Sequence, residues 1–190
     1  MTRLAPVVLL VVLAGCRAPA SVPPPHEAFW QSLQGLCTAA FEGRVTEASP
    51  PDTVFSRATL TMHVRECSAD TIRIPFHVGE DRSRTWVLTR SDSGLRLKHD
   101  HRHLDGTEDS VTQYGGDTRD GGTDGRQEFH ADEHTAALIP AARTNIWTIE
   151  LVPGERFAYG LRREGTDRRF RAEFDLTGPV AAPPRPWGAP

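Results

Sequence analysis

The chain has 190 residues, which is enough for one domain with a substantial hydrophobic core. Its 22 Lys and Arg residues nearly balance its 25 Asp and Glu residues, so its charge does not indicate a nucleic-acid partner. Hydrophobic residues make up 38% of the chain, a content that argues against a disordered protein.

The first sixteen residues have the pattern of a secretion signal. Arg3 supplies a positive charge, and residues 4–13 form an apolar run that is too short to span a bilayer. The run leads into Leu13-Ala14-Gly15-Cys16, which resembles the bacterial lipobox. This resemblance implies a cleaved signal peptide over residues 1–15 and a membrane anchor of acyl chains on Cys16. An ordinary secretory signal with a chance cysteine is the alternative.

The residues after Cys16 bear on the final location. Arg17 stands where an inner-membrane retention signal would have Asp, so the lipobox resemblance implies the outer membrane, facing the periplasm. Residues 16–25 contain four prolines and are predicted to be a lipidated tether between the membrane and the folded domain.

Such a location outside the cytoplasm is oxidising. Once Cys16 is lipidated, only Cys37 and Cys67 remain, and they are predicted to form a disulfide. Closing a loop of about thirty residues should stabilise the fold by roughly 3–4 kcal/mol.

The folded domain is predicted to span residues 26–177. Residues 26–40 carry apolar side chains at helical spacing and predict one helix, whose apolar face is formed by Phe29, Trp30, Leu33, Leu36, Cys37 and Ala40. Alternating apolar and polar residues then predict strands at 41–47, 60–64, 72–78, 85–90, 95–103, 111–114, 127–130, 145–152, 156–163 and 169–176.

Other segments complete the predicted organisation. Residues 115–125 are expected to be a loop, and Asp132 can cap a short helix through Ala137. His63 and His77 fall on the polar faces of their strands, where surface positions are expected. Residues 178–190, with five prolines, are predicted to be a disordered tail.

About ten strands in hairpin succession after one helix predict an all-β fold, an up-and-down antiparallel β-barrel. This layout resembles the calycin group, the lipocalins and their relatives, which implies an enclosed ligand cavity. The Gly-x-Trp usual on the first strand of that group is replaced here by Glu42-Gly43-Arg44. The histidine run and residues 112–116 also resemble uncharacterised secreted bacterial proteins, a resemblance that implies no activity.

The histidine-rich strand carries the most distinctive chemistry. Its alternate residues Leu95, Leu97, His99, His101 and His103 share one face, because side chains on a strand alternate with period two. The two leucines mark that face as buried. The imidazoles are therefore expected to continue a core-facing row toward the strand end and the barrel mouth.

These imidazoles can form a metal site. His99, His101 and His103, with Glu108 on the following turn, offer ligands that suit a divalent transition metal such as zinc. Alternatively, the strand end is solvated and the same histidines form hydrogen bonds with nearby aspartates. A third interpretation is that the clustered imidazoles sense pH.

The same stretch resembles the first cupin motif through Gly94, His101, His103, Glu108 and Gly115. The second cupin motif is missing, because no histidine follows Pro153-Gly154.

Two arginine pairs flank one predicted turn, Arg162-Arg163 and Arg168-Arg169. They can meet a phosphate or an anionic head group, and a solvated hairpin end is the alternative.

Three functions stay open. The first is a non-catalytic, membrane-tethered barrel that binds a small apolar ligand in a cavity lined by Met62, Phe76, Trp86, Leu97, Trp147 and Tyr159. The second is a metal-binding protein or enzyme that uses the histidine cluster, and the third is a structural envelope protein. The chain lacks the usual nucleophile elbow, phosphate-binding loop, zinc-protease motif and dinucleotide fingerprint.

Overall fold

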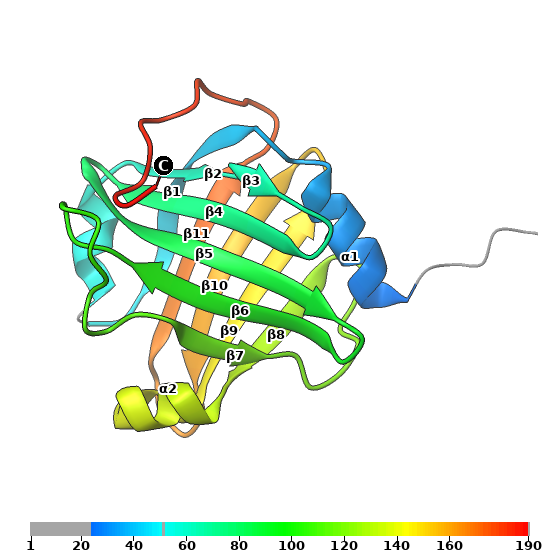
Figure 1. Ribbon diagram of the computed structural model, residues 1–190, viewed down its shortest axis with the longest axis vertical. Helices are drawn as coiled ribbons and strands as arrows, with labels where there is room; N and C mark the ends of the chain where they lie inside the picture. The colour runs from blue at the N-terminus through cyan, green and yellow to red at the C-terminus, as the bar shows by residue number, and fades with distance from the viewer. Residues whose placement is uncertain (1–23, 51, 190) are drawn as a thin grey trace, which may run out of the picture.

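The computed structural model describes residues 24–50 and 52–189 (Figure 1). The predicted signal peptide, the lipidation site Cys16 and most of the tether lie outside these residues and stay predictions. Within the described part of the chain, the helices are too short or too polar to cross a membrane.

In residues 24–50 and 52–189, two helices and eleven strands form the regular structure, together with two short 3-10 helices. In chain order the elements are α1 (Pro25–Gln34), β1 (Ala40–Ala48), η1 (Asp52–Arg57), β2 (Leu60–His63), β3 (Glu66–Cys67), β4 (Thr71–Val78), β5 (Asp81–Ser91), β6 (Gly94–His101), β7 (Tyr114–Asp117), β8 (Arg126–Ala131), α2 (Glu133–Leu138), η2 (Pro140–Ala142), β9 (Asn145–Val152), β10 (Arg156–Arg163) and β11 (Arg169–Asp175).

The strands form a closed barrel. Every pairing is antiparallel, and neighbours follow the chain from β4 through β11 and on to β1. The barrel closes because β2 pairs with β1 on one side and with β4 on the other. β3 only extends the edge of β4, so ten of the 11 strands make the ring. The predicted up-and-down antiparallel barrel with one N-terminal helix is confirmed.

Helix α1 packs against one end of the barrel (Figure 1). Phe29, Trp30 and Leu33 on its inner face are fully buried in the core. At the end of β5, Arg90 lies over the Trp30 ring at 5.4 Å and pairs with Glu27 at 2.5 Å. These contacts place the end of β5 and the start of β6 beside α1.

The helix is shorter than the sequence predicts. It ends at Gln34, and Cys37 lies in the following turn, while Ala40 already begins β1. Thr38 adopts a left-handed conformation with φ 71°, and its N–H donates to the carbonyl of Val64 at 2.7 Å. The residues after Gln34 continue the helical spacing, but the N–H groups of Leu36 and Cys37 bond three residues back, to Leu33 and Gln34, and the chain then turns away at Thr38.

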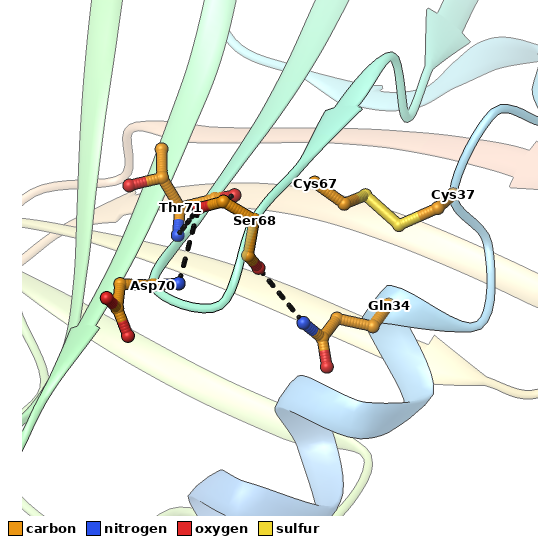
Figure 2. Close-up of a disulfide and its surroundings, with 6 residues drawn as sticks. All are labelled: Gln34, Cys37, Cys67, Ser68, Asp70 and Thr71. Atoms are coloured by element: carbon orange, nitrogen blue, oxygen red, sulfur yellow. Dashed lines mark hydrogen bonds between the residues drawn. A yellow bond between two sulfur atoms is a disulfide. The ribbon is translucent and has the colours of Figure 1, made fainter.

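The predicted disulfide between Cys37 and Cys67 is present (Figure 2). It joins the turn after α1 to β3. Beside it, the side-chain amide of Gln34 donates to the carbonyl of Ser68 at 3.1 Å. The Ser68 hydroxyl in turn accepts the N–H of Thr71 at 2.9 Å, which fixes the turn between β3 and β4. The disulfide and these hydrogen bonds therefore attach α1 to the barrel wall.

The strand predicted at 111–114 is wrong in position. β7 instead runs over Tyr114–Asp117, so it shares only Tyr114 with the predicted strand and continues into the segment expected to be a loop. The neighbouring backbones come very close at its two glycines. A Cβ on Gly115 would lie 1.9 Å from the carbonyl oxygen of Leu97, and one on Gly116 would lie 1.6 Å from that of His130. Glycine is required here by packing, and it hides the strand pattern.

The surface position expected for His77 is also wrong, because its exposed fraction is only 3%. Ile72, Ile74 and Phe76 form the inward face of β4, so His77 does point outward. The outer face of the barrel is itself covered at this position.

Residues 178–189, expected to be disordered, have defined contacts on the barrel. The N–H of Val180 donates to the carbonyl of Ala40 at 2.8 Å. Farther on, the backbone N–H of Trp187 donates to the carbonyl of Arg82 at 3.1 Å. The guanidinium of Arg82 donates to the carbonyl of Arg185 at 3.1 Å. The tail therefore lies against the outside of the barrel without regular secondary structure, apart from the bridge at Val180.

Candidate functional site

The inward row of β6 follows the prediction as far as the strand extends. Leu95, Leu97 and His99 are buried, and His101 is partly buried at the strand end. Since β6 starts beside α1, His99 and His101 lie toward the opposite end of the barrel. The row of imidazoles therefore runs from the core to the far mouth.

Both ring nitrogens of His99 have hydrogen-bond partners. Its Nδ1 lies 3.1 Å from the carbonyl oxygen of Tyr114, which can only accept, so Nδ1 carries the proton. Its Nε2 lies 2.7 Å from the hydroxyl of Tyr159 and accepts from it. Burial lowers the pKa of His99 to about 3, which keeps the imidazole neutral at neutral pH.

His101 and Tyr114 form the next layer toward the mouth. The Tyr114 hydroxyl lies 3.2 Å from Nε2 of His101, and the Tyr114 ring stacks on His99 with centroids 4.5 Å apart. Burial, and then the charge of Arg84, lower the pKa of His101 to about 4. Burial also raises the pKa of Tyr114 to about 12. Both rings are therefore neutral hydrogen-bonding groups at neutral pH.

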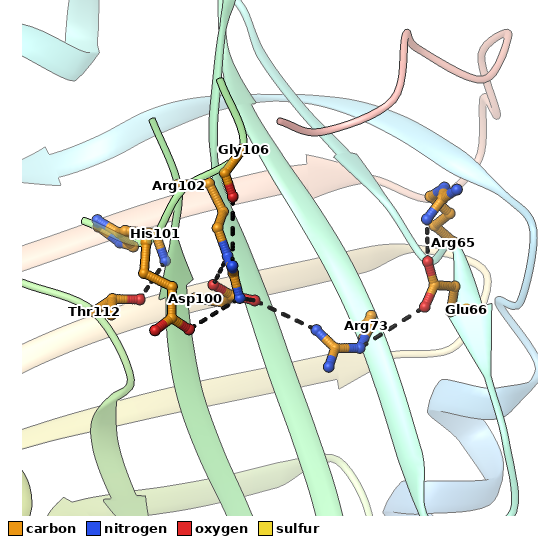
Figure 3. Close-up of polar contacts among 9 residues, drawn as sticks. Arg65, Glu66, Arg73, Asp100, His101, Arg102, Gly106 and Thr112 are labelled. Carbon is orange, nitrogen blue, oxygen red and sulfur yellow. Dashed lines mark hydrogen bonds and ion pairs between the residues drawn. The ribbon is translucent and has the colours of Figure 1, made fainter. Parts of the chain in front are cut away.

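The outward face of β6 is an ion-pair network (Figure 3). Asp100 accepts from Nε of Arg102 at 2.8 Å and pairs with Arg73 at 3.5 Å. Arg73 also pairs with Glu66 at 3.8 Å. In the same view, the backbone N–H of His101 donates to the Thr112 hydroxyl at 2.8 Å. These contacts hold the strand so that His99 and His101 face inward.

The predicted metal ligands are only partly brought together. His103 lies exposed in the turn after β6, and Glu108 pairs with Arg102 at 3.0 Å. Across residues 24–50 and 52–189, no group of three His, Cys, Asp or Glu side chains is arranged to hold a metal ion. The metal site stays a prediction, and His99 would have to give up an existing hydrogen bond to act as a ligand.

A cavity of about 330 Å³ lies where His99 and His101 face inward. Strand ends, η1 and η2 surround it, so it lies at the end of the barrel away from α1. Its apolar surface is mostly aromatic, formed by Phe55, Phe76, Trp86, Trp147, Tyr159 and Phe170. Of the predicted lining residues, Phe76, Trp86, Trp147 and Tyr159 border the cavity. Met62 and Leu97 do not, because they are fully buried in the packed core.

The aromatic floor is ordered by stacking. The Trp86 ring lies between Phe76, at a centroid distance of 4.7 Å, and Tyr159, at 4.5 Å. The interplanar angles are 11° and 21°, so the three rings form a nearly parallel stack. The three rings line the cavity and form one apolar side of it.

Charged and polar side chains form the other part of the lining. Asp52, from η1, pairs with Arg168 at 2.7 Å, and Nε of Arg163 donates to the side-chain oxygen of Asn145 at 2.8 Å. Arg84 lies over the Phe55 ring at 5.4 Å. One arginine from each predicted pair, Arg163 and Arg168, therefore faces the cavity.

Arg84 and Asp52 also line the cavity, and neither is among the site residues predicted from the sequence. A signal for Arg84 was present, because it lies two positions before Trp86 on the inward face of β5. An arginine on the apolar face of a strand indicates that the barrel interior is not fully packed with apolar side chains at that position. Asp52 gave no such signal, since it lies in a segment dense in turn residues.

Comparison with family models, with curated proteins and with solved structures found no significant match.

Proposed function

We propose that the protein binds a small ligand with a flat ring in the cavity at the open end of the barrel. The observation that carries the proposal is the contrast between the two ends. The core beside α1 is filled by buried side chains, whereas the far end has a cavity of about 330 Å³ above a stack of aromatic rings. Concave, mainly apolar sites with a few convergent polar groups are the usual binding sites of small molecules.

The size of the cavity supports a compact ligand. Small-molecule sites typically measure about 300–1,000 Å³, and this cavity lies at the lower end of that range. The neutral His101 and Tyr114 and the amide of Asn145 supply hydrogen-bonding groups along its wall. A compound that carries a fused two-ring group is therefore a suitable probe.

The test uses the neutral fluorescent probe N-phenylnaphthylamine. Wild-type protein should bind it with one saturable site. Leu161→Trp should abolish this binding, because Leu161 borders the cavity and is only partly buried, so the larger ring has room to enter it. Leu104→Trp is the matched control, since Leu104 is 74% exposed and does not border the cavity.

Urea unfolding of both variants checks that they fold. Equal probe binding by wild type and Leu161→Trp, or no saturable binding by the wild type, would refute the proposal.

The same proposal includes a membrane location, with the barrel anchored through acyl chains on Cys16. It is supported by the lipobox resemblance and by the disulfide, which suits an oxidising compartment. In a bacterial host, Cys16→Ser should move the protein from the membrane fraction to a soluble fraction. Metabolic labelling with palmitate should mark the wild type and not the variant. Equal labelling of the two would refute lipidation at Cys16.

A further inference from the structure

Positive charge is in excess around the cavity. Three arginines border it, Arg84, Arg163 and Arg168, whereas Asp52 is the one carboxylate among its lining residues in the described chain. Asp81 does not border the cavity but pairs with Arg84. Even when Asp81 is counted, two carboxylates face three guanidinium groups. The two histidines on the wall do not change this balance, because both are neutral.

Arg163 and Arg168 are the arginines with spare hydrogen-bonding capacity. In the described part of the chain, the guanidinium of Arg163 has a single hydrogen bond, to Asn145, and no ion pair. Burial and the charge of Arg168 both lower the pKa of Arg163, so these two positive groups repel each other. Arg168 pairs with Asp52 through one terminal nitrogen, while its buried Nε has no acceptor among the described residues. Unpaired buried donors of this kind are costly.

An anion between these arginines would remove both penalties. A carboxylate has two oxygens that accept from guanidinium groups in a planar, bidentate geometry, and such charge-assisted hydrogen bonds are stronger than neutral ones. The ring stack around Trp86 borders the same cavity as the two arginines. A molecule that satisfies both parts of the lining needs a flat ring and an acid group joined by a short link.

We infer that the cavity selects a small aromatic acid, whose carboxylate lies between Arg163 and Arg168 and whose ring lies among the aromatic side chains that line the cavity. This inference rests on the proposed function and adds the chemical class of the ligand to it. It also assigns a role to Arg163 and Arg168, one from each arginine pair that flanks the turn between β10 and β11. Arg162 and Arg169 do not border the cavity.

The experiment compares naphthaleneacetate with naphthaleneacetamide by calorimetry at pH 7 and low salt. The two probes have the same shape and differ in charge. The acid should bind the wild type about tenfold more tightly than the amide, because only the acid forms charge-assisted hydrogen bonds. In Arg163→Gln this preference should fall to within about twofold, because the acid loses its charge-assisted hydrogen bonds to Arg163.

Two further variants control for folding and for net charge. Arg162→Gln removes the same charge from the adjacent position, where the arginine pairs with Glu128 at 3.2 Å and does not border the cavity. It should keep the wild-type preference for the acid. Arg163→Lys keeps the charge and should retain a preference that is reduced but measurable, because lysine cannot bind the carboxylate in the same bidentate way.

The outcomes separate this inference from the proposed function. Equal affinity of the wild type for acid and amide would overturn the inference and leave the binding function standing. If neither the acid nor the amide bound while N-phenylnaphthylamine still did, the inference would likewise be overturned and the binding function would stand. An equal loss of preference in Arg162→Gln would show that overall charge, and not Arg163, is responsible. Failure of all three probes would overturn the binding function itself.

Discussion

The Nε2 atom of His99 lies 2.7 Å from the hydroxyl oxygen of Tyr159 inside the barrel, and the two residues come from β6 and β10. The exposed fractions of the two residues are 3% and 8%, so water cannot easily replace either partner. The other His99 nitrogen donates to the backbone of Tyr114. One imidazole therefore connects strands that lie apart in the sheet order across the barrel interior.

The first prediction concerns this hydrogen bond. Tyr159→Phe should lower the free energy of unfolding by about 1–3 kcal/mol, because it leaves Nε2 of His99 buried without a donor. Tyr114→Phe is the matched control. It removes a hydroxyl whose partner, His101, is only partly buried and can turn to water, so the loss should stay below about 1 kcal/mol. Urea unfolding at pH 7 measures both, and equal losses would contradict the assignment.

The second prediction concerns pH. The pKa of buried His99 is lowered from 6.5 to about 3, so the unfolded chain binds more protons than the native state between these values. The stability that His99 contributes is therefore fully present above pH 6.5 and is lost as the pH falls toward 3. Between pH 6.5 and pH 5 the free energy of unfolding should fall by about 2 kcal/mol through His99 alone.

Urea unfolding at several pH values compares two variants for this prediction. His99→Gln cannot titrate and should remove about 2 kcal/mol of the loss in this window, while His101 and His77, whose pKa values are each lowered to about 4, keep the rest of the pH dependence. His103→Gln removes an imidazole that is exposed in the turn after β6, and it should keep the wild-type slope. An unchanged slope in His99→Gln would show that another group causes the loss.

The third prediction concerns the disulfide. Cys37→Ala combined with Cys67→Ala should lower the free energy of unfolding by about 3–4 kcal/mol, because the unfolded chain regains the freedom of a loop with a sequence separation of 30. Reduction of the wild type with a small thiol should cause a loss of similar size. If the reduced wild type and the double variant were both as stable as the oxidised protein, the disulfide would contribute nothing to the free energy of unfolding.

Simple alternation was sufficient to predict most of the barrel. Ile72, Ile74 and Phe76 mark one inward face, and Phe157 and Tyr159 mark another, so each strand could be placed from its own residues. β7 escaped prediction because its central residues are glycines, which are required by the close approach of neighbouring backbones and carry no side-chain pattern.

The site was predictable only where it depends on one strand. The inward direction of His99 followed from Leu95 and Leu97 on the same face of β6. Its partners did not follow, since Tyr114 and Tyr159 come from β7 and β10, and strand register across a barrel is not visible in a single segment. For the same reason, the sequence could not indicate that Arg163 and Arg168 meet Arg84 at one cavity.

The fourth prediction tests the ion pairs on the outer face of β6. The side chain of Asp100 is 11% exposed and lies between Arg73 and Arg102. Asp100→Asn should lower the free energy of unfolding by about 1–3 kcal/mol, because two guanidinium groups would then face each other without the carboxylate between them. Asp117→Asn is the matched control, since Asp117 on β7 pairs with Arg96 on β6 and the two side chains are 45% and 53% exposed.

Surface ion pairs contribute little, so the loss in Asp117→Asn should stay below about 1 kcal/mol and should shrink further in high salt. Urea unfolding at pH 7, with and without added salt, measures both variants. The Asp100→Asn loss should persist in salt, since the carboxylate is largely shielded from solvent. Losses of equal size in the two variants, both removed by salt, would mean that Asp100 acts as an ordinary surface charge and does not hold β6 in place.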